Sequence, residues 1–304
     1  MLSRTASNLF WLTRYLERAE STIRLLDACF QPGLPFEGDI NQLYSLPLQI
    51  QTADADFRAQ HPNDQNDLNI GKVSNFLLNG NTNSSVRFCL EAARENARSE
   101  RSRLSTELWE AINQTWLEFQ KTQHLPLKAV KEWLQQSLFL IQGTIDVTMP
   151  ETLSYRFLKL GTYLERSDQT LRVLEAQTKL QDIGNYSEYY TWNMLLKAVS
   201  SFEAYQETFM EVPSQQRVFK FLLFNRSIPR SLRYCNERIH TIADIIGGDK
   251  RRNVMRVSSQ LLTKLRYDQL EDIETATPAE YIKQLQNDVL KLAIAIQEGY
   301  FVTV

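Results

Sequence analysis

The sequence is poor in the residues that interrupt helices, with 10 glycines and 9 prolines among 304 residues. This scarcity argues against an all-β or loop-rich fold and favours helices. No uncharged apolar run approaches the 18 residues that suggest a membrane-spanning helix. The 34 lysines and arginines nearly balance the 36 aspartates and glutamates, so neither nucleic acid nor an anionic membrane is an expected partner.

Cysteine and histidine are also scarce, with three of each, and their positions form no metal-ligand spacing. Cys29, Cys89 and Cys235 lie far apart beside apolar residues, which predicts reduced, packed thiols. The N-terminal residues lack the basic segment, apolar core and cleavage site of a signal peptide. We therefore expect a cytoplasmic protein without a metal or another cofactor.

The most informative feature that is present is an internal repeat. Residues 15–28 return as residues 163–176, 148 positions further along, and every position but two is identical or chemically close. Shorter matches follow in the same order, namely 73–78 with 218–223, 85–89 with 231–235, and 141–148 with 296–303. Such an ordered series of matches predicts an internal duplication.

The repeat defines the expected domain organisation. The matches place a boundary near Met149 and Pro150, and no Gly/Ser-rich linker separates the two parts. We expect one domain, 1–304, composed of a first half, 1–149, and a second half, 150–304, packed about a pseudo-twofold axis.

Apolar residues recur at helical spacing in both halves. They alternate at intervals of three and four from Leu9 to Phe30, and a second stripe runs from Phe157 to Leu174. Residues 31–69 contain four prolines and are expected to be mostly loop, with at most a short helix near 40–46. Further helices are predicted over 86–120, 127–148, 189–210, 230–246, 250–269 and 278–301. The expected fold is all-α, a helical bundle built from two similar halves.

Charged residues border the apolar stripe of each repeat helix. They are Glu17, Glu20, Arg24 and Asp27 in the first half, and Glu165, Asp168, Arg172 and Glu175 in the second. The helix expected from residue 86 carries a basic stripe, formed by Arg87, Arg94, Arg98 and Arg101. The acidic and basic stripes are complementary if these helices pack together.

Three interpretations of these charges remain open. They form a structural network that fixes the register between helices, or a pocket whose arginines bind a phosphate or carboxylate, or a carboxylate-bridged metal site. The metal site is the weakest because no histidine lies near these helices. Arg18 and Arg166 lie roughly opposite the apolar stripe, so their face is either covered by another layer or is solvated surface.

A second candidate site lies where a helix follows a loop, with Ser227 or Ser231 as its cap. Arg226, Arg230 and Arg233 gather there, and helix N-termini bind anions through free peptide N–H groups. We find no Gly-rich phosphate loop, Gly-x-Ser-x-Gly elbow, His-Glu-x-x-His or paired Cys-x-x-Cys. Carboxylates beside arginines have lowered pKa values that suit ion pairing better than proton transfer. No residue is therefore assigned as catalytic.

At its repeated motifs the sequence resembles the alpha-E domain family, a bacterial all-helical family of unknown function named for its Glu-Arg motif. The resemblance spans nearly the whole chain, and the segments that carry it are 1–4, 8–20, 93–98, 104–110 and 163–166. The loop 79–85 departs from the family pattern, in which an Asn-Pro motif is expected.

The resemblance implies a setting for the protein. Family members are typically encoded beside, or fused to, circularly permuted ATP-grasp proteins and near transglutaminase-like proteins, which implies ATP-dependent peptide or amide-bond chemistry. The leading hypothesis is a non-catalytic accessory protein that docks on an ATP-grasp-type amide ligase. The alternative is a ligand-binding protein or an enzyme that uses a Glu/Arg pocket on an acidic or phosphorylated peptide-like substrate. A scaffold that only forms homo-oligomers is the third hypothesis.

Overall fold

The computed structural model describes residues 1–30, 40–62, 68–122, 125–181, 188–248, 251–268 and 277–301. Within these ranges every regular element is helical, which confirms the expected all-α class. The longer helices are α1 (Ser3–Cys29), α2 (Ile40–Ile50), α4 (Ile70–Asn79), α5 (Val86–Ser99), α6 (Thr106–Phe119), α7 (Leu127–Thr148), α8 (Leu153–Gln181), α9 (Glu188–Ala198), α12 (Leu232–Ile246), α13 (Arg251–Tyr267) and α15 (Pro278–Tyr300). Shorter ones are α3 (Asp54–Gln60), η1 (Arg101–Arg103), α10 (Phe202–Phe209), α11 (Gln215–Phe219) and the π-helical turn η3 (Lys220–Phe224).

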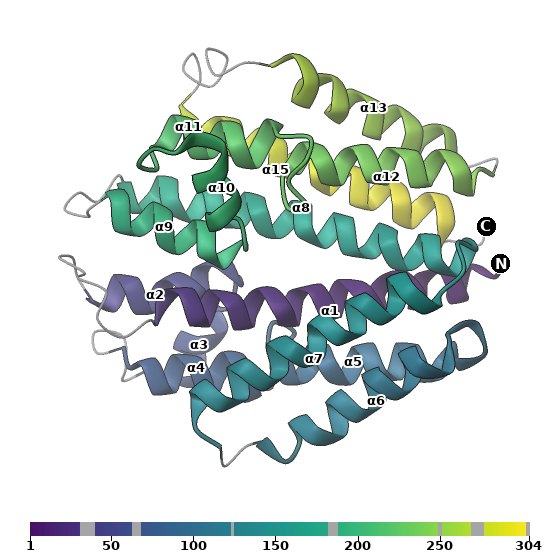
Figure 1. Ribbon diagram of the computed structural model, residues 1–304, viewed down its shortest axis with the longest axis horizontal. Coiled ribbons are helices and arrows are strands. Elements are labelled where there is room, and N and C mark those ends of the chain that lie inside the picture. Colours follow the sequence, from purple (N-terminus) through teal and green to yellow (C-terminus); the bar gives the residue numbers. More distant parts are fainter. Residues whose placement is uncertain are drawn as a thin grey trace.

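The two longest described helices, α1 and α8, pack against each other through the middle of the molecule (Figure 1). They run in the same direction. In that view α4, α5 and α6 lie below the pair, and α11, α12, α13 and α15 lie above it. α5 packs on α1 as α12 packs on α8, and α6 and α13 pack in turn on α5 and α12. One continuous hydrophobic core joins both sides.

α1 and α8 approach closely because a glycine lies at their crossing. A Cβ atom on Gly161 would overlap the carbonyl oxygen of Phe10 and the hydroxyl of Thr13. That hydroxyl donates a hydrogen bond to the Leu158 carbonyl across the interface (2.6 Å). The close approach aligns the two repeated helices and fixes which of their charged residues meet.

α5 and α12 begin in the same way, each with a serine at its N-cap. The Ser85 hydroxyl accepts from the Phe88 N–H at the start of α5 (3.2 Å), and the Ser231 hydroxyl accepts from the Tyr234 N–H at the start of α12 (3.1 Å). These hydroxyls satisfy N–H groups that have no partner inside the helix. Of the two serines considered as the cap, Ser231 is the one that fills this role.

Matching caps also end α2 and α9. Thr52 and Ser200 follow these helices with left-handed backbones, at φ 53° and 47°, and they lie 148 positions apart in sequence. In each case this residue and the next donate N–H bonds to carbonyls of the last helical turn, at 2.8–3.0 Å. This pattern is a Schellman motif. It terminates α9 where the Ala198 carbonyl meets Arg24 of α1, and α2 where Gln51 meets Gln169 of α8.

Three sequence-based boundaries were wrong. The described part of 31–69 contains α2 and α3, since the buried apolar side chains of α2 outweigh the helix-breaking effect of Pro47. The helix predicted over 86–120 is interrupted after Ser99, and α6 begins anew behind its own cap, Ser105. The helix predicted over 189–210 stops at the left-handed Ser200.

Among the described helices, none contains a stretch that is both long enough and apolar enough to cross a membrane.

Candidate functional site

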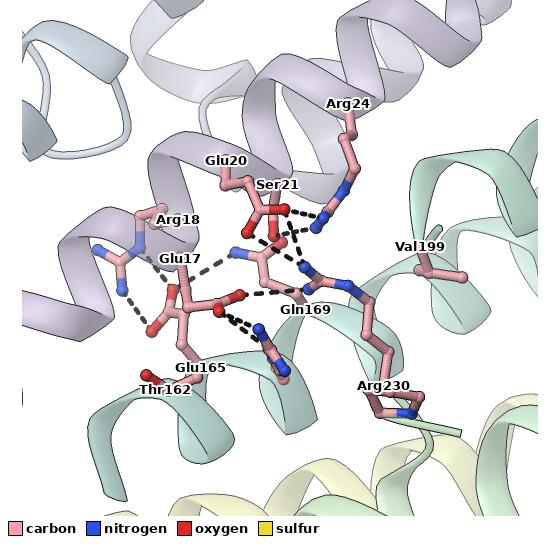
Figure 2. A network of polar contacts seen from close by, with 12 residues as sticks. Glu17, Arg18, Glu20, Ser21, Arg24, Thr162, Glu165, Gln169, Val199 and Arg230 are labelled. Atoms are coloured by element: carbon pink, nitrogen blue, oxygen red, sulfur yellow. Dashed lines mark hydrogen bonds and ion pairs between the residues drawn. The ribbon is translucent and has the colours of Figure 1, made fainter. Parts of the chain in front are cut away.

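The two repeated Glu-Arg dipeptides exchange partners across the α1–α8 interface (Figure 2). Glu17 of α1 accepts from Nε and Nη2 of Arg166 in α8, at 2.9 and 2.6 Å. Glu165 of α8 accepts from Nε and Nη2 of Arg18 in α1, at 2.7 and 3.2 Å. Because the helices run in parallel, the same dipeptide on each one places its carboxylate opposite the guanidinium of the other.

Each of these carboxylates also binds a second arginine. Arg14 Nε lies 2.7 Å from Glu165 Oε2, and Arg230 Nη1 lies 3.3 Å from Glu17 Oε2. The repeat does not relate these two arginines, since Thr162 stands where Arg14 would recur. Glu17 and Glu165 therefore bind their second arginines from positions that the sequence repeat does not relate. Sequence reasoning missed Arg14, although it lies one helical turn before Arg18 on the same face.

A third carboxylate, Glu20, extends the cluster. Arg230 Nη2 lies 3.1 Å from both of its oxygens, and Arg24 forms an ion pair with it one turn along α1. The Gln142 amide bridges the carboxylates, donating to Glu20 at 2.6 Å and to Glu17 at 3.0 Å. We call this cluster the Glu–Arg network; it comprises Arg14, Glu17, Arg18, Glu20, Arg24, Gln142, Glu165, Arg166 and Arg230.

The network is almost sealed from solvent. Its three glutamate side chains are at most 2% exposed and its five arginine side chains at most 16%. Burial alone would raise the pKa of Glu20, but the charges of Arg24 and Arg230 outweigh it and lower the pKa to about 2. Arg14 and Arg18 lower the pKa of Glu165 to about 2 in the same way. Such carboxylates are ionised at neutral pH and are poor proton acceptors.

The structure brings together seven of the predicted site residues. They are Glu17, Arg18, Glu20, Arg24, Glu165, Arg166 and Arg230. Arg18 and Arg166, whose face was left open between a covered and a solvated one, are covered, and the covering layer is the other repeat helix. Burial alone would lower the pKa values of Arg18 and Arg166, but the charges of Glu165 and Glu17 outweigh it and raise both.

The predicted basic stripe on α5 does not join the network. α5 turns its apolar residues toward α1, so Arg87 and Arg98 are exposed on the outer surface, and Arg101, which lies in η1, is exposed as well. Arg94 is half-buried and pairs with Glu95 at 2.9 Å and with Asn113 at 2.8 Å. The expected complementarity between the stripes of α1 and α5 is therefore wrong among the described residues. The acidic side chains of α1 meet arginines of α8 and of the loop before α12 instead.

The remaining predicted site residues lie at the edge of the Glu–Arg network or outside it. Asp168 and Arg172 form a half-buried ion pair of their own within α8 (2.8 Å). Arg226 is exposed and Arg233 pairs with Glu237 at 3.2 Å, so the three arginines expected to form one anion site diverge. Arg230 alone turns inward, at a point where the Thr170 hydroxyl binds its carbonyl (2.8 Å).

Cys29, Cys89 and Cys235 are free and buried, and burial raises the pKa of each thiol. The described residues contain no group of His, Cys, Asp and Glu side chains that could hold a metal ion. His124 and residues 302–303 of the third repeat match lie outside the described residues.

Comparison with known proteins gives one result. The model of the Alpha-E family, described as a predicted alpha-helical domain with a conserved ER motif, matches residues 1–301. Two Leu-Glu-Arg triplets of this chain, at 16–18 and 164–166, contain the dipeptides that exchange partners in the network. No curated protein and no solved structure shows significant similarity.

Proposed function

We propose, from the premise that this chain belongs to the Alpha-E family, that it is a non-catalytic accessory protein of an ATP-grasp-type amide (peptide) ligase. In this role it docks on the ligase and stabilises it or helps to present its substrate. The proposed compartment is the bacterial cytoplasm, where buried free thiols remain reduced.

The observation that supports this role most is the internal pairing of the Glu–Arg network. Each of Glu17, Glu20 and Glu165 binds two arginines and is buried, so none is available to a substrate. A network of this kind fixes the arrangement of helices rather than performing acid–base chemistry. The working surface is then expected on the outside of the molecule.

We further infer that the chain is an internal duplication about a pseudo-twofold axis. The exchanged Glu-Arg dipeptides, the two serine caps and the two left-handed helix ends at Thr52 and Ser200 support this inference. Parallel packing of α1 and α8 requires the axis to run alongside both helices. The inferred halves are 1–149 and 150–304, within one domain.

The outer groove between α6 and α7 is the surface that suits a partner best. Its volume is about 700 Å³, and Glu107, Glu110 and Gln114 of α6 line one side of it. On the α7 side Leu140 is 63% exposed, and Val147, two turns further on, is 85% exposed. Carboxylates beside exposed apolar side chains favour a partner segment that is basic and amphipathic.

Affinity purification of the tagged chain from its own host, followed by mass spectrometry, tests the proposal. We expect an ATP-grasp protein in near-equal amount, and a change in its ATP turnover or products when this chain is added. The double substitution Glu107→Lys and Glu110→Lys should weaken the complex. Glu91→Lys with Glu298→Lys, which changes equally exposed carboxylates elsewhere, should not. Identical turnover and products with and without the chain, and no association at micromolar concentration, would contradict the proposal.

The surplus of arginine in the Glu–Arg network favours a second candidate function. This function is the binding or conversion of an acidic or phosphorylated peptide-like substrate in the network. The network contains five arginines and three glutamates. The cavity beside these arginines is only about 10 Å³, so a peptide would require α1 and α8 to separate. Protection of α1 from hydrogen exchange by an acidic peptide would support this function over the accessory role.

A further inference from the structure

The Glu–Arg network carries more positive than negative charge. Its five guanidinium groups face three carboxylates, and all eight side chains are at least 84% buried. Asp168 is also close enough to influence Arg18, but it forms its own ion pair with Arg172, so the imbalance remains. An uncompensated charge away from water strongly destabilises a fold.

The ends of neighbouring helices reduce the imbalance only partly. Arg24 Nε donates to the Ala198 carbonyl at the C-terminal end of α9, at 3.2 Å, and a helix C-terminus carries roughly half a negative charge. Arg230 directly precedes the N-cap of α12, whose N-terminal end contributes positive charge of similar size. Burial and the charge of Arg230 accordingly lower the pKa of Arg24 to about 10.

A small cavity lies where this surplus is concentrated. Arg24 and Arg230 line it together with Ser21, Gln51 and Gln169, and every residue around it is buried. Figure 2 shows the guanidinium groups of Arg24 and Arg230 pointing toward each other, with Ser21 and Gln169 nearby. Its volume of about 10 Å³ accommodates one species the size of a water molecule or halide ion.

Arg24 has N–H groups that no hydrogen bond among the described residues uses. Each guanidinium carries five N–H groups, and the hydrogen bonds of Arg24 to Glu20, Ser21 and Ala198 use three of them. The amides of Gln51 and Gln169 contact each other at 3.4 Å, near the limit for a hydrogen bond, so their N–H groups can turn toward a stronger acceptor at low cost.

We propose that this cavity binds a single small inorganic anion of halide size. Arg24 and Arg230 supply the charge, and an amide of Gln51 or Gln169 supplies a further donor. The bound anion ties α1 and α8 to the ends of α2 and α9 and so stabilises the whole fold. This site does not depend on the accessory role and would exist whether or not a ligase binds.

Thermal unfolding of the full chain in different sodium salts at constant ionic strength is the first test. Binding to the folded state alone raises the melting temperature by mass action, by roughly 5 °C at a hundredfold excess over the dissociation constant. We expect chloride and bromide to give a saturating rise. Gluconate, which is too large for the cavity, should give none. Equal melting temperatures in all salts would overturn the proposal.

Two variants separate the cavity from general salt effects. Gln51→Glu places a carboxylate in the cavity, so it should raise the melting temperature in gluconate and remove the chloride dependence. Arg172→Gln changes the repeat counterpart of Arg24, which is half-buried and outside the cavity lining, so it should keep the full chloride dependence. A Gln51→Glu variant that folds and keeps the wild-type dependence would overturn the proposal.

Direct location of the ion completes the test. Crystals soaked in sodium bromide should show an anomalous scattering peak between Arg24 and Arg230, and the Gln51→Glu crystals should lack it. A cavity that holds only water at saturating bromide, or bromide found solely on the surface, would rule out the site.

Discussion

Glu20 and Asp168 occupy the same position of the two repeats but differ in environment. Glu20 is fully buried between Arg24 and Arg230, whereas Asp168 is about a quarter exposed and pairs with Arg172 of its own helix. A half-buried pair within one helix contributes little because water screens it. Removal of a fully buried carboxylate leaves its arginines without a counter-charge. The two carboxylates at this repeat position therefore contribute differently to the stability of the fold.

Glu20→Gln should therefore destabilise the protein far more than Asp168→Asn. We expect a loss of about 3–5 kcal/mol in the free energy of unfolding for the first substitution and about 1 kcal/mol or less for the second. Denaturation in urea, followed by circular dichroism, measures both. Equal losses of unfolding free energy in the two variants would show that the contribution of these carboxylates to stability does not depend on burial.

Acid should weaken the fold through the same carboxylates. Arginines hold the pKa values of Glu20 and Glu165 at about 2 in the folded state, below the ordinary value of 4.5 expected on unfolding. Their contribution is complete above pH 4.5 and is lost as the pH falls toward 2, because the unfolded chain then binds more protons. Urea midpoints should fall between pH 5 and pH 3, and less steeply in Glu20→Gln. Unchanged midpoints in the wild type would contradict this account.

Sequence reasoning identified most network residues but not their partners. The repeated Leu-Glu-Arg pattern marked Glu17, Arg18, Glu165 and Arg166, since both halves carry it. Spacing along one helix cannot show that each carboxylate binds the arginine of the other helix. Gln51 was missed because it follows α2, in a segment expected to be loop.

At the scale of elements, the contact between α1 and α8 depends on Gly161. An added methyl group would overlap the backbone of α1, so Gly161→Ala should force the helices apart and cost about 1–3 kcal/mol. Gly143 lies on the exposed side of α7 with open space around it, so Gly143→Ala should stabilise by up to about 1 kcal/mol through helix propensity. Thermal unfolding should show a lower melting temperature for Gly161→Ala and a higher one for Gly143→Ala. A stabilising Gly161→Ala would mean that the helices do not pack as closely as described.

Helix positions were predicted better where apolar periodicity was uninterrupted. The helix predicted over 127–148 coincides with α7, whereas Ser105 and Ser200 break two others. The spacing of apolar residues indicates which face of a helix is buried, but it does not show where a cap or a left-handed residue ends the helix. In α2 the sequence predicts too little helix. Pro47 suggests a loop, but the buried apolar residues Leu43, Leu46 and Ile50 hold the segment in a helix.

At the scale of the whole molecule, residues 1–149 and residues 150–304 supply arginines to each other's carboxylates. Glu17 and Glu20 of the first half depend on Arg166 and Arg230 of the second, and Glu165 depends on Arg14 and Arg18 of the first. The apolar contact between α1 and α8 is shared in the same way. Neither half has both a sealed core and compensated charges by itself.

Residues 1–149 and 150–304 expressed separately should each fail to unfold cooperatively, and mixing them should restore the helical content as a 1:1 complex. Circular dichroism and light scattering measure both results. Each half could instead pair with its own copy, because the exchanged dipeptides allow Glu17 to meet Arg18 of a second copy. Such a homodimer of the first half would lack Arg230, and one of the second half would lack Arg14, so the mixed complex should be preferred. A first half that folds alone as a monomer, or a homodimer that persists after mixing, would show that these two arginines do not select the pairing.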